Sequence, residues 1–180
     1  MAGLFLRDLW YNKICASILI PNKLRVRLYT CGGGVQLHRG VSIFPHCFLE
    51  SANLEIGEDT FVNYECWFNI AGKITIGRMC NIAYKVTFIT STHEIADRER
   101  RAGKPISKEI TVGDGTWIGA NVTILPGVNI GSGVIIAAGS VVVHDCEDNS
   151  IYAGNPAKLI KNFDEHEHNC CVQVNWCTLN

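Results

Sequence analysis

Apolar residues recur at every sixth position through much of this 180-residue chain. A small or β-branched residue stands four positions after most of them, and glycine or alanine often follows them directly. An α-helix repeats every 3.6 residues and a strand alternates every two, so neither element produces this period. The pattern instead predicts short strands separated by tight corners. Its longest uninterrupted run is Val112, Ile118, Ile124, Ile130, Ile136 and Val142.

The upstream part of the chain carries the same repeat in sets of three. Between sets the phase slips, as it does between Leu49 and Ile56 and between Phe68 and Ile76. A triangular coil has three strands and three corners, and extra residues fit at one corner without moving the inward side chains. The sequence therefore predicts a mainly β fold, a parallel β-helix shaped as a triangular prism. The sets are Leu37, Ile43 and Leu49; Ile56, Val62 and Phe68; and Ile76, Ile82 and Phe88.

The repeat divides the chain into an N-terminal helical segment (1–34), the β-helix (35–162) and a polar C-terminal tail (163–180). An apolar run at residues 14–20 ends at Pro21 and is too short for a bilayer span, which needs roughly 20 residues. Seven residues fit an amphipathic helix, whose apolar face could pack on the body, on another subunit or on a membrane surface. We favour packing against protein. These residues are Leu4, Phe5, Leu6, Leu9, Trp10, Ile14 and Ile18.

Charge and cysteine content argue against several classes of protein. With 16 Lys and Arg against 17 Asp and Glu, the chain lacks the basic surplus of a nucleic-acid binder. Its nine cysteines form no CxxC pair of the kind found in zinc ribbons, and no secretory signal supports a disulfide scaffold. We therefore expect reduced thiols in a cytoplasmic protein. Four of these residues fall at the small inward position, where we expect them to pack: Cys47, Cys66, Cys80 and Cys146.

The six-residue repeat stops after Thr92 and resumes at Ile110. The intervening loop, residues 94–109, is charged and lacks the repeat, so it must leave the prism as an excursion. Long loops in compact domains are often functional. His93 stands at the root of this loop, and an imidazole can serve as a general base near neutral pH. We expect the active site at this break.

Three motifs accompany the break: TSTH at 90–93, ITVGDGTWIG at 110–119 and YAGNPAK at 152–158. Together with the repeat they resemble the hexapeptide-repeat acyltransferase superfamily. The similarity is to the branch of maltose, galactoside and nodulation-type O-acetyltransferases, with capsular and colanic-acid-type sugar acetyltransferases. The resemblance covers residues 37–161 and implies a left-handed β-helix, against the usual hand of parallel crossovers. It also implies acetyl-CoA as co-substrate, no required metal, and a homotrimer with active sites between neighbouring prisms.

The resemblance implies direct acetyl transfer to a sugar or polysaccharide hydroxyl. His93 would be the general base, and Asn63 and Trp117 would bind the acceptor. Ala71 falls where this branch carries an acidic sugar-binding residue, so neither galactoside nor maltose is assumed as acceptor. The residues implied to bind CoA are Ala120, Ala138, Val143, His144, Lys158 and Lys161, with the two lysines meeting phosphates.

Other functions stay open at this point. An N-acetyltransferase acting on an amino sugar or another small acceptor uses the same fold. A zinc carbonic anhydrase needs closely spaced histidine ligands, and the coils contain no such pair. A non-catalytic β-helix scaffold would bind no CoA. The tail carries further potential ligands for an adventitious metal: His166, His168, Cys170, Cys171 and Cys177.

Overall fold

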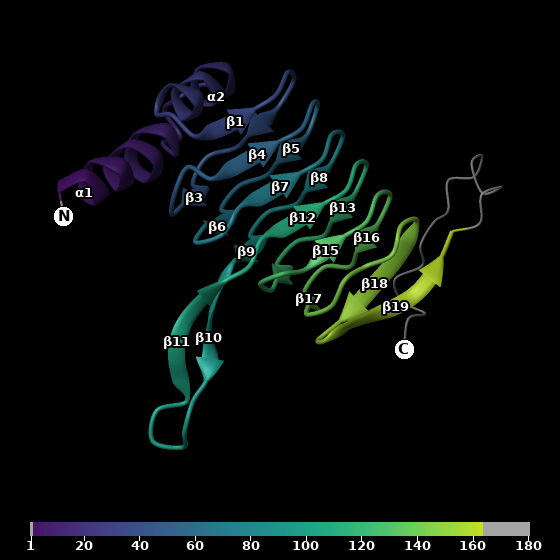
Figure 1. Ribbon diagram of the computed structural model, residues 1–180. Helices are drawn as coiled ribbons and strands as arrows, with labels where there is room; N and C mark the ends of the chain where they lie inside the picture. The colour runs from purple at the N-terminus through teal and green to yellow at the C-terminus, as the bar shows by residue number, and fades with distance from the viewer. Residues whose placement is uncertain (1, 164–180) are drawn as a thin grey trace.

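The chain winds into a triangular β-helix of about six turns (Figure 1). The structure is a computed structural model that describes residues 2–163, without the side chains of Ala2 and Leu4. Successive turns contribute strands to three sheets, in which neighbouring turns pair in parallel. The predicted mainly β parallel β-helix, with three strands per turn, is confirmed. The histidines and cysteines predicted for the tail lie outside the described residues.

The three sheets form the three walls of the prism. The first sheet contains, in spatial order, β1 (Val35–Leu37), β4 (Leu54–Ile56), β7 (Ile74–Ile76), β12 (Ile110–Val112) and β15 (Asn129–Ile130). The second contains β2 (Ser42–Ile43), β5 (Phe61–Val62), β8 (Asn81–Ile82), β13 (Trp117–Ile118), β16 (Ile135–Ile136), β18 (Ser150–Gly154) and the antiparallel β19 (Ala157–Asn162). The third contains β3 (Phe48–Leu49), β6 (Trp67–Asn69), β9 (Thr87–Ile89), β14 (Thr123–Ile124) and β17 (Val141–Val142).

Each turn has three corners. The first corner joins the first sheet to the second, the second corner joins the second sheet to the third, and the third corner leads into the next turn. The predicted extra residues lie beside the third corner, where they lengthen the flanking strands. β4 consequently buries two side chains, Leu54 and Ile56, where the two-residue β5 buries only Val62.

The residue that precedes each small inward position often has a left-handed backbone. Asp59, with a φ of 54°, precedes Thr60, and Met79, with a φ of 56°, precedes Cys80. This conformation turns the chain sharply at the corner and places the next side chain inside the prism. Thr60 and Cys80 are both fully buried as a result.

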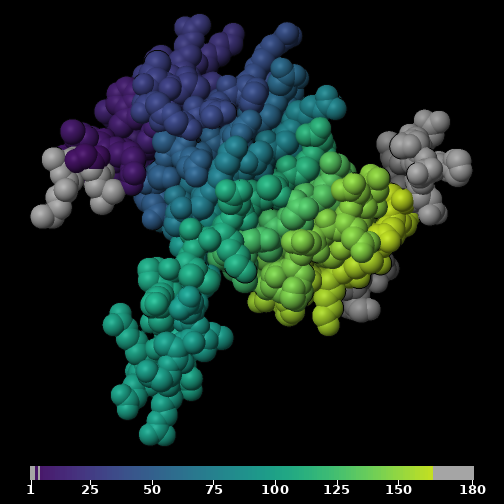
Figure 2. All heavy atoms as spheres, in the orientation of Figure 1, coloured from purple at the N-terminus to yellow at the C-terminus, as the bar shows by residue number. Residues whose placement is uncertain are grey.

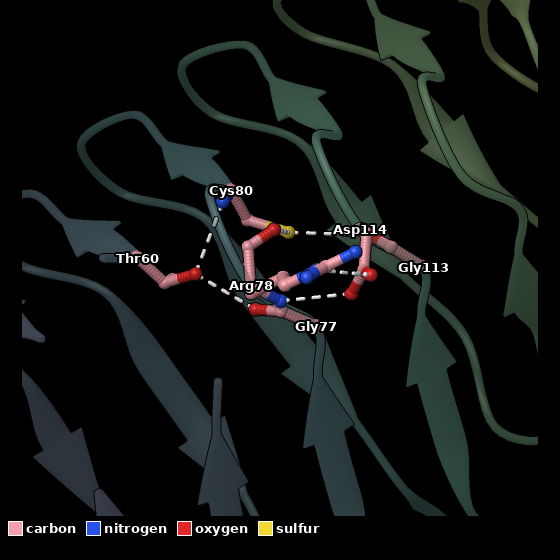
Figure 3. Close-up of polar contacts among 6 residues, drawn as sticks. All are labelled: Thr60, Gly77, Arg78, Cys80, Gly113 and Asp114. Carbon is pink, nitrogen blue, oxygen red and sulfur yellow. Dashed lines mark hydrogen bonds and ion pairs between the residues drawn. The ribbon is translucent and has the colours of Figure 1, made fainter. Parts of the chain in front are cut away.

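The small inward residues also bond successive turns together. The Thr60 hydroxyl donates to the Gly77 carbonyl at 2.7 Å, and the Cys80 thiol donates to the Gly113 carbonyl at 3.2 Å (Figure 3). The Cys66 thiol donates in the same way to the Ala83 carbonyl, at 3.2 Å. All four inward cysteines are buried, so the prediction that they are packing residues is confirmed. The hydrogen bonds that Cys47, Cys66 and Cys80 donate to the next turn were not predicted.

Glycines occupy the first corner in four consecutive turns, at Gly57, Gly77, Gly113 and Gly131. A Cβ atom on Gly113 would lie 2.6 Å from the Gly131 carbonyl carbon and 2.6 Å from the Ser132 backbone nitrogen. Such contacts are shorter than real Cβ atoms show. Close stacking of the turns at the first corner therefore requires glycine in this column.

Aspartates cap the same corner from outside. Asp114 Oδ1 accepts the Arg78 backbone N–H at 2.9 Å, and Asp114 Oδ2 accepts the Arg78 Nε–H at 2.8 Å (Figure 3). Both bonds lower the pKa of the Asp114 carboxyl group, and the bond from the Arg78 backbone has the larger effect. Asp148 repeats the backbone cap on Ser132, at 2.7 Å.

The excursion at the third corner is an antiparallel hairpin, although we expected a loop. It consists of β10 (Ser91–Ile95) and β11 (Ala102–Ser107), and its pairing is irregular between His93 and Ile95. Figures 1 and 2 show the hairpin standing well clear of the prism. Its side chains are mostly exposed, so the paired backbone holds this shape rather than a core of its own.

The N-terminal helices close one end of the prism. They are α1 (Ala2–Asp8), the π-helical η1 (Leu9–Cys15) and α2 (Asn22–Cys31). The Ile43 N–H donates to Asn22 Oδ1 at 3.1 Å, and the Leu49 N–H donates to Asn12 Oδ1 at 2.8 Å. These side-chain amides bond the strands of the first turn, where no earlier turn exists. Buried Arg25 ties the helices together by donating to the carbonyls of Cys15, Ser17, Ile20 and Ile43.

Only part of the apolar face predicted for this segment packs on the body of the chain. Trp10 packs against the core, and its indole N–H donates to the Leu28 carbonyl at 3.1 Å. The buried side chains of η1 are Tyr11 and Cys15, whereas Phe5 and Leu6 are 66% and 62% exposed. Our expectation assumed that the most apolar stripe faces inward, and the helix instead buries a tyrosine and a small thiol beneath α2. None of the helices in residues 2–163 combines the length and the apolar character needed to cross a bilayer.

We predict that Gly113→Ala lowers the free energy of unfolding by about 1–3 kcal/mol, because the new methyl group must push apart two turns of backbone. Urea denaturation measures this change. Gly3→Ala is the control, because a Cβ atom there meets nothing within 4 Å and alanine favours a helix by up to about 1 kcal/mol. Equal effects of the two substitutions would contradict the packing argument.

We also predict that the buried thiols resist alkylation in the folded state. Of the six cysteines in the described part of the chain, Cys31 alone is exposed. In a background with Cys170, Cys171 and Cys177 replaced by serine, native protein should react with iodoacetamide at one thiol, and urea-unfolded protein at all six. Mass spectrometry counts the adducts. Rapid native labelling of Cys66 or Cys80 would overturn this prediction.

The same burial makes stability depend on alkaline pH. It raises the pKa of the Cys15 thiol to about 11 and that of the Cys146 thiol to about 12, against roughly 8.5 in an unfolded chain. The folded state holds these protons more tightly. The stabilisation that these two buried thiols contribute is therefore fully present below about pH 8, and it is lost between about pH 9 and pH 12. Urea titrations at increasing pH should show this fall, and Cys146→Ala should reduce it.

Candidate active site

A shallow groove runs along the outer face of the second sheet and its second corner. It encloses about 480 Å³, and most of its surface is apolar. Small residues at the corner leave the space open, because larger side chains there would fill it. The lining residues are Ala83, Trp117, Gly119, Ala120, Ile135, Ile136, Ala137 and Ala138.

Trp117 forms part of the groove wall. Its side chain is 46% exposed, and it begins β13, paired in parallel with Asn81 of β8 and Ile135 of β16. The pairing on both sides fixes the Trp117 backbone, and the backbone N–H of Trp117 donates to the Val134 carbonyl at 2.8 Å. The structure therefore places this predicted acceptor residue beside Ala120 and Ala138, which were predicted to bind CoA.

Asn63 stands in the same column as the groove, one turn earlier. Its backbone N–H donates to the Ile82 carbonyl, and the next residue of the column, Ala83, donates to the Ile118 carbonyl. Asn63 Oδ1 accepts the Tyr64 N–H at 2.9 Å, while its amide nitrogen bonds to nothing among residues 2–163. The left-handed residue of this corner is Glu65, so Asn63 is not there to adopt that conformation. Its amide N–H groups are available to a ligand.

His93 lies apart from this groove within one chain. It belongs to β10, where it pairs with Pro105, and its exposed side chain has no hydrogen-bond or ionic partner in the described part of the chain. It is not among the groove residues. The hairpin leaves from the third corner, whereas the groove follows the second sheet and second corner.

The remaining predicted CoA residues are also separate from the groove. Val143 and His144 follow β17 at the third corner, and both are at least partly accessible. Lys158 and Lys161 are exposed on β19, which extends the second sheet beyond β16 through β18. The Lys161 ammonium lies 5.7 Å from the centre of the Phe163 ring.

Five groove residues were missed in the sequence: Ala83, Gly119, Ile135, Ile136 and Ala137. A signal for three of them was present, because Ala83, Gly119 and Ala137 each directly follow an inward aliphatic residue at the second corner. Ile135 could not be found in this way, since it projects outward from a strand whose inward residue is Ile136. Among residues 2–163, no three His, Cys, Asp or Glu side chains lie close enough together to hold a metal ion.

Comparison with known proteins agrees with this geometry. Residues 109–144 match the family model described as bacterial transferase hexapeptide (six repeats). A Saccharomyces cerevisiae protein named "Putative acetyltransferase YJL218W" is 39% identical over 116 residues, 64% of this chain and 59% of its own length. A Staphylococcus aureus protein named "Putative acetyltransferase SAR2635" is 39% identical over 112 residues, 62% of this chain and 56% of its own. The chain thus spans less than two thirds of these relatives.

Solved structures match more of the chain. A hexapeptide-repeat acetyltransferase from Vibrio cholerae covers 91% of this chain and is itself covered to 90%, with a TM-score of 0.79 and 28% identity. A galactoside acetyltransferase in complex with coenzyme A gives a TM-score of 0.77 at 27% identity, with coverages of 91% and 80%. A maltose O-acetyltransferase from Clostridium difficile gives 0.72 at 28% identity, with coverages of 91% and 86%.

The stacked turns of three six-residue repeats, the three parallel walls and the groove define a hexapeptide-repeat β-helix. The family model and the solved structures confirm the resemblance found in the sequence. This chain has the fold of the hexapeptide-repeat acetyltransferases, and residues 109–144 match the hexapeptide family model.

Proposed function

We propose that this protein is an acetyl-CoA-dependent O-acetyltransferase that acts on a sugar or polysaccharide hydroxyl. The observation that carries the proposal is the apolar groove along the second corner, with Asn63 in the same column. Neighbours with this fold and over 25% identity include a sugar O-acetyltransferase and structures with CoA or acetyl-CoA bound. The proposal includes a cytoplasmic location and no metal in the reaction.

The groove suits the arm of CoA that carries the thioester. That arm is a narrow chain of methylene and amide groups, and alanines at the corner leave both space and accessible backbone. In the proposal Ala120 and Ala138 border the arm, and Val143 and His144 lie further along its path. Lys158 and Lys161 would meet the phosphates as point charges at the exposed end of the second sheet.

The acceptor would lie next to Asn63 and Trp117. The Asn63 amide can donate hydrogen bonds to a sugar oxygen, and the exposed ring of Trp117 can cover an apolar sugar face. At Ala71 the chain has a methyl group where the branch carries an acidic sugar-binding residue. We therefore assume neither galactoside nor maltose as the acceptor. Screening hydroxyl acceptors with acetyl-CoA and following CoA release would identify it.

His93 would act as the general base in direct transfer. Its imidazole accepts the acceptor hydroxyl proton as that oxygen attacks the thioester carbonyl, and a tetrahedral oxyanion forms. Collapse of this intermediate breaks the carbon–sulfur bond. The CoA sulfur leaves with the proton returned by the imidazolium, so the acetyl group moves from sulfur to oxygen without an acyl-enzyme.

A complete site requires two copies of the chain in this proposal. His93 is carried on a hairpin that stands clear of its own prism (Figure 1). The groove follows a different corner. A homotrimer brings the hairpin of one protomer to the groove of its neighbour, because a closed ring uses the same pair of surfaces at each interface. The exposed His93 side chain, unpartnered within residues 2–163, fits such an arrangement.

We predict that His93→Ala reduces kcat by roughly 10²- to 10⁴-fold, the usual contribution of a general base. The KM for acetyl-CoA should change little, because in the proposal His93 acts on the acceptor hydroxyl and does not bind CoA. The assay follows CoA release with a thiol reagent. His38→Ala is the matched control, since that exposed histidine bonds Glu55 on the first sheet, away from the groove. If His93→Ala keeps the wild-type rate, the base assignment is wrong.

We further predict that two inactive variants restore activity when mixed. Ala138→Phe should fill the groove and prevent CoA binding, while Met79→Phe, at the exposed first corner, should leave binding intact. After Ala138→Phe and His93→Ala chains are unfolded and refolded together, roughly a quarter of the sites in random trimers pair a native hairpin with a native groove. Activity should recover to that fraction. No recovery would show that each site is built within one protomer.

A further inference from the structure

The N-terminal helices present an apolar strip to solvent. Leu9 and Ile14 are exposed in η1, where Tyr11 and Cys15 form the buried side, and Leu19 in the following turn is 85% exposed. Large apolar side chains are not usually gathered at the surface of a monomer without a partner. We define the apolar strip by six exposed residues: Phe5, Leu6, Leu9, Ile14, Ile18 and Leu19.

Basic residues are exposed on the same N-terminal segment as the apolar strip. Lys13 lies next to Ile14 in η1, and Lys23 and Arg27 are exposed on α2. Residues 1–31 contain five Lys and Arg and one acidic residue, a net charge of +4, whereas residues 32–180 carry eleven Lys and Arg and sixteen Asp and Glu, a net charge of −5. The positive charge is thus concentrated in the segment that bears the strip.

We infer that this segment binds the surface of an anionic membrane. Exposed Phe and Leu side chains with Lys and Arg beside them are the pattern of helices that lie in the lipid interface. The apolar side chains would enter the boundary between headgroups and acyl chains. Lys13, Lys23 and Arg27 would meet lipid phosphates, and the field of an anionic leaflet would draw the +4 segment rather than the acidic remainder of the chain to the membrane.

The shape of the surface favours lipid over a second copy of this chain. Figure 2 shows the N-terminal helices as a protruding, convex end of the molecule. A protein interface needs a complementary hollow for each protruding side chain, whereas lipid adapts to any of them. The inference does not depend on the acetyltransferase proposal, because no residue of the strip lines the groove.

Vesicle co-sedimentation tests the inference with the full-length protein. The protein should pellet with vesicles of phosphatidylcholine that contain about one third phosphatidylglycerol, and not with pure phosphatidylcholine. Leu9→Glu combined with Leu19→Glu should reduce the partition coefficient at least about tenfold. Lys13→Gln should reduce it about fivefold, with a smaller effect at high salt. Ile95→Glu, at an 89% exposed position in the hairpin, is the matched control and should bind as the wild type does.

Thermal unfolding of each variant verifies that it is folded. The substituted positions are exposed, so the substitutions should leave the fold intact. Failure of the wild type to bind anionic vesicles, or undiminished binding by the Leu9→Glu, Leu19→Glu variant, overturns the inference. Sedimentation velocity tests whether a second copy of the chain covers the apolar strip instead of lipid. A change of oligomeric mass in this variant without a change in vesicle binding assigns the strip to a subunit interface. If vesicle binding begins only after residues 164–180 are deleted, the apolar strip is the binding surface for that segment. Either result would also overturn the inference.

Discussion

Backbone contact between successive turns at the first corner is the constraint on which this molecule depends. There is no space for even a methyl group between Gly113 and Gly131, and the same is true along the column from Gly57. Such close spacing lets side chains of one turn bond to the backbone of the next, as the Thr60 hydroxyl and the Cys80 thiol do. The turn must therefore have a nearly fixed length, and the six-residue period of the sequence follows from this requirement.

The constraint also determines where function can be located. Two of the three corners are occupied by glycines, small inward residues and left-handed turns, so a long insertion would break the stack there. The third corner accepts one, and the hairpin that carries His93 leaves from it. At the second corner the same need for small residues leaves a groove on the outside, between Trp117 and Ala138. The groove is thus a by-product of close stacking.

The interior of the prism could be predicted from sequence because its period has a single cause. The inward positions, including Cys66 and Cys146, follow from the spacing alone. The hairpin could not be predicted, since β10 and β11 have exposed side chains on both faces and no apolar alternation. In the N-terminal segment, Tyr11, Cys15 and part of Trp10 lie against the body, whereas the more apolar Phe5 and Leu6 do not, so hydrophobicity alone did not identify the buried side. For the site, the motifs indicated Trp117, Ala120 and Ala138. They did not indicate that these residues and His93 lie at different corners of the prism, because that separation depends on how the chain winds and not on residue type.

The caps at the two ends of the prism determine how large the molecule can become. A stack of parallel turns has no intrinsic last member, because each end displays unpaired N–H and C=O groups that can accept another chain. At the N-terminal end Asn12 and Asn22 occupy such groups with side-chain amides. At the other end β19 pairs with β18 in the antiparallel direction, so the parallel pattern of the second sheet is not continued. Together these features terminate what would otherwise be a fibre-forming element, and loss of either cap would turn a discrete particle into a template for end-to-end polymerisation.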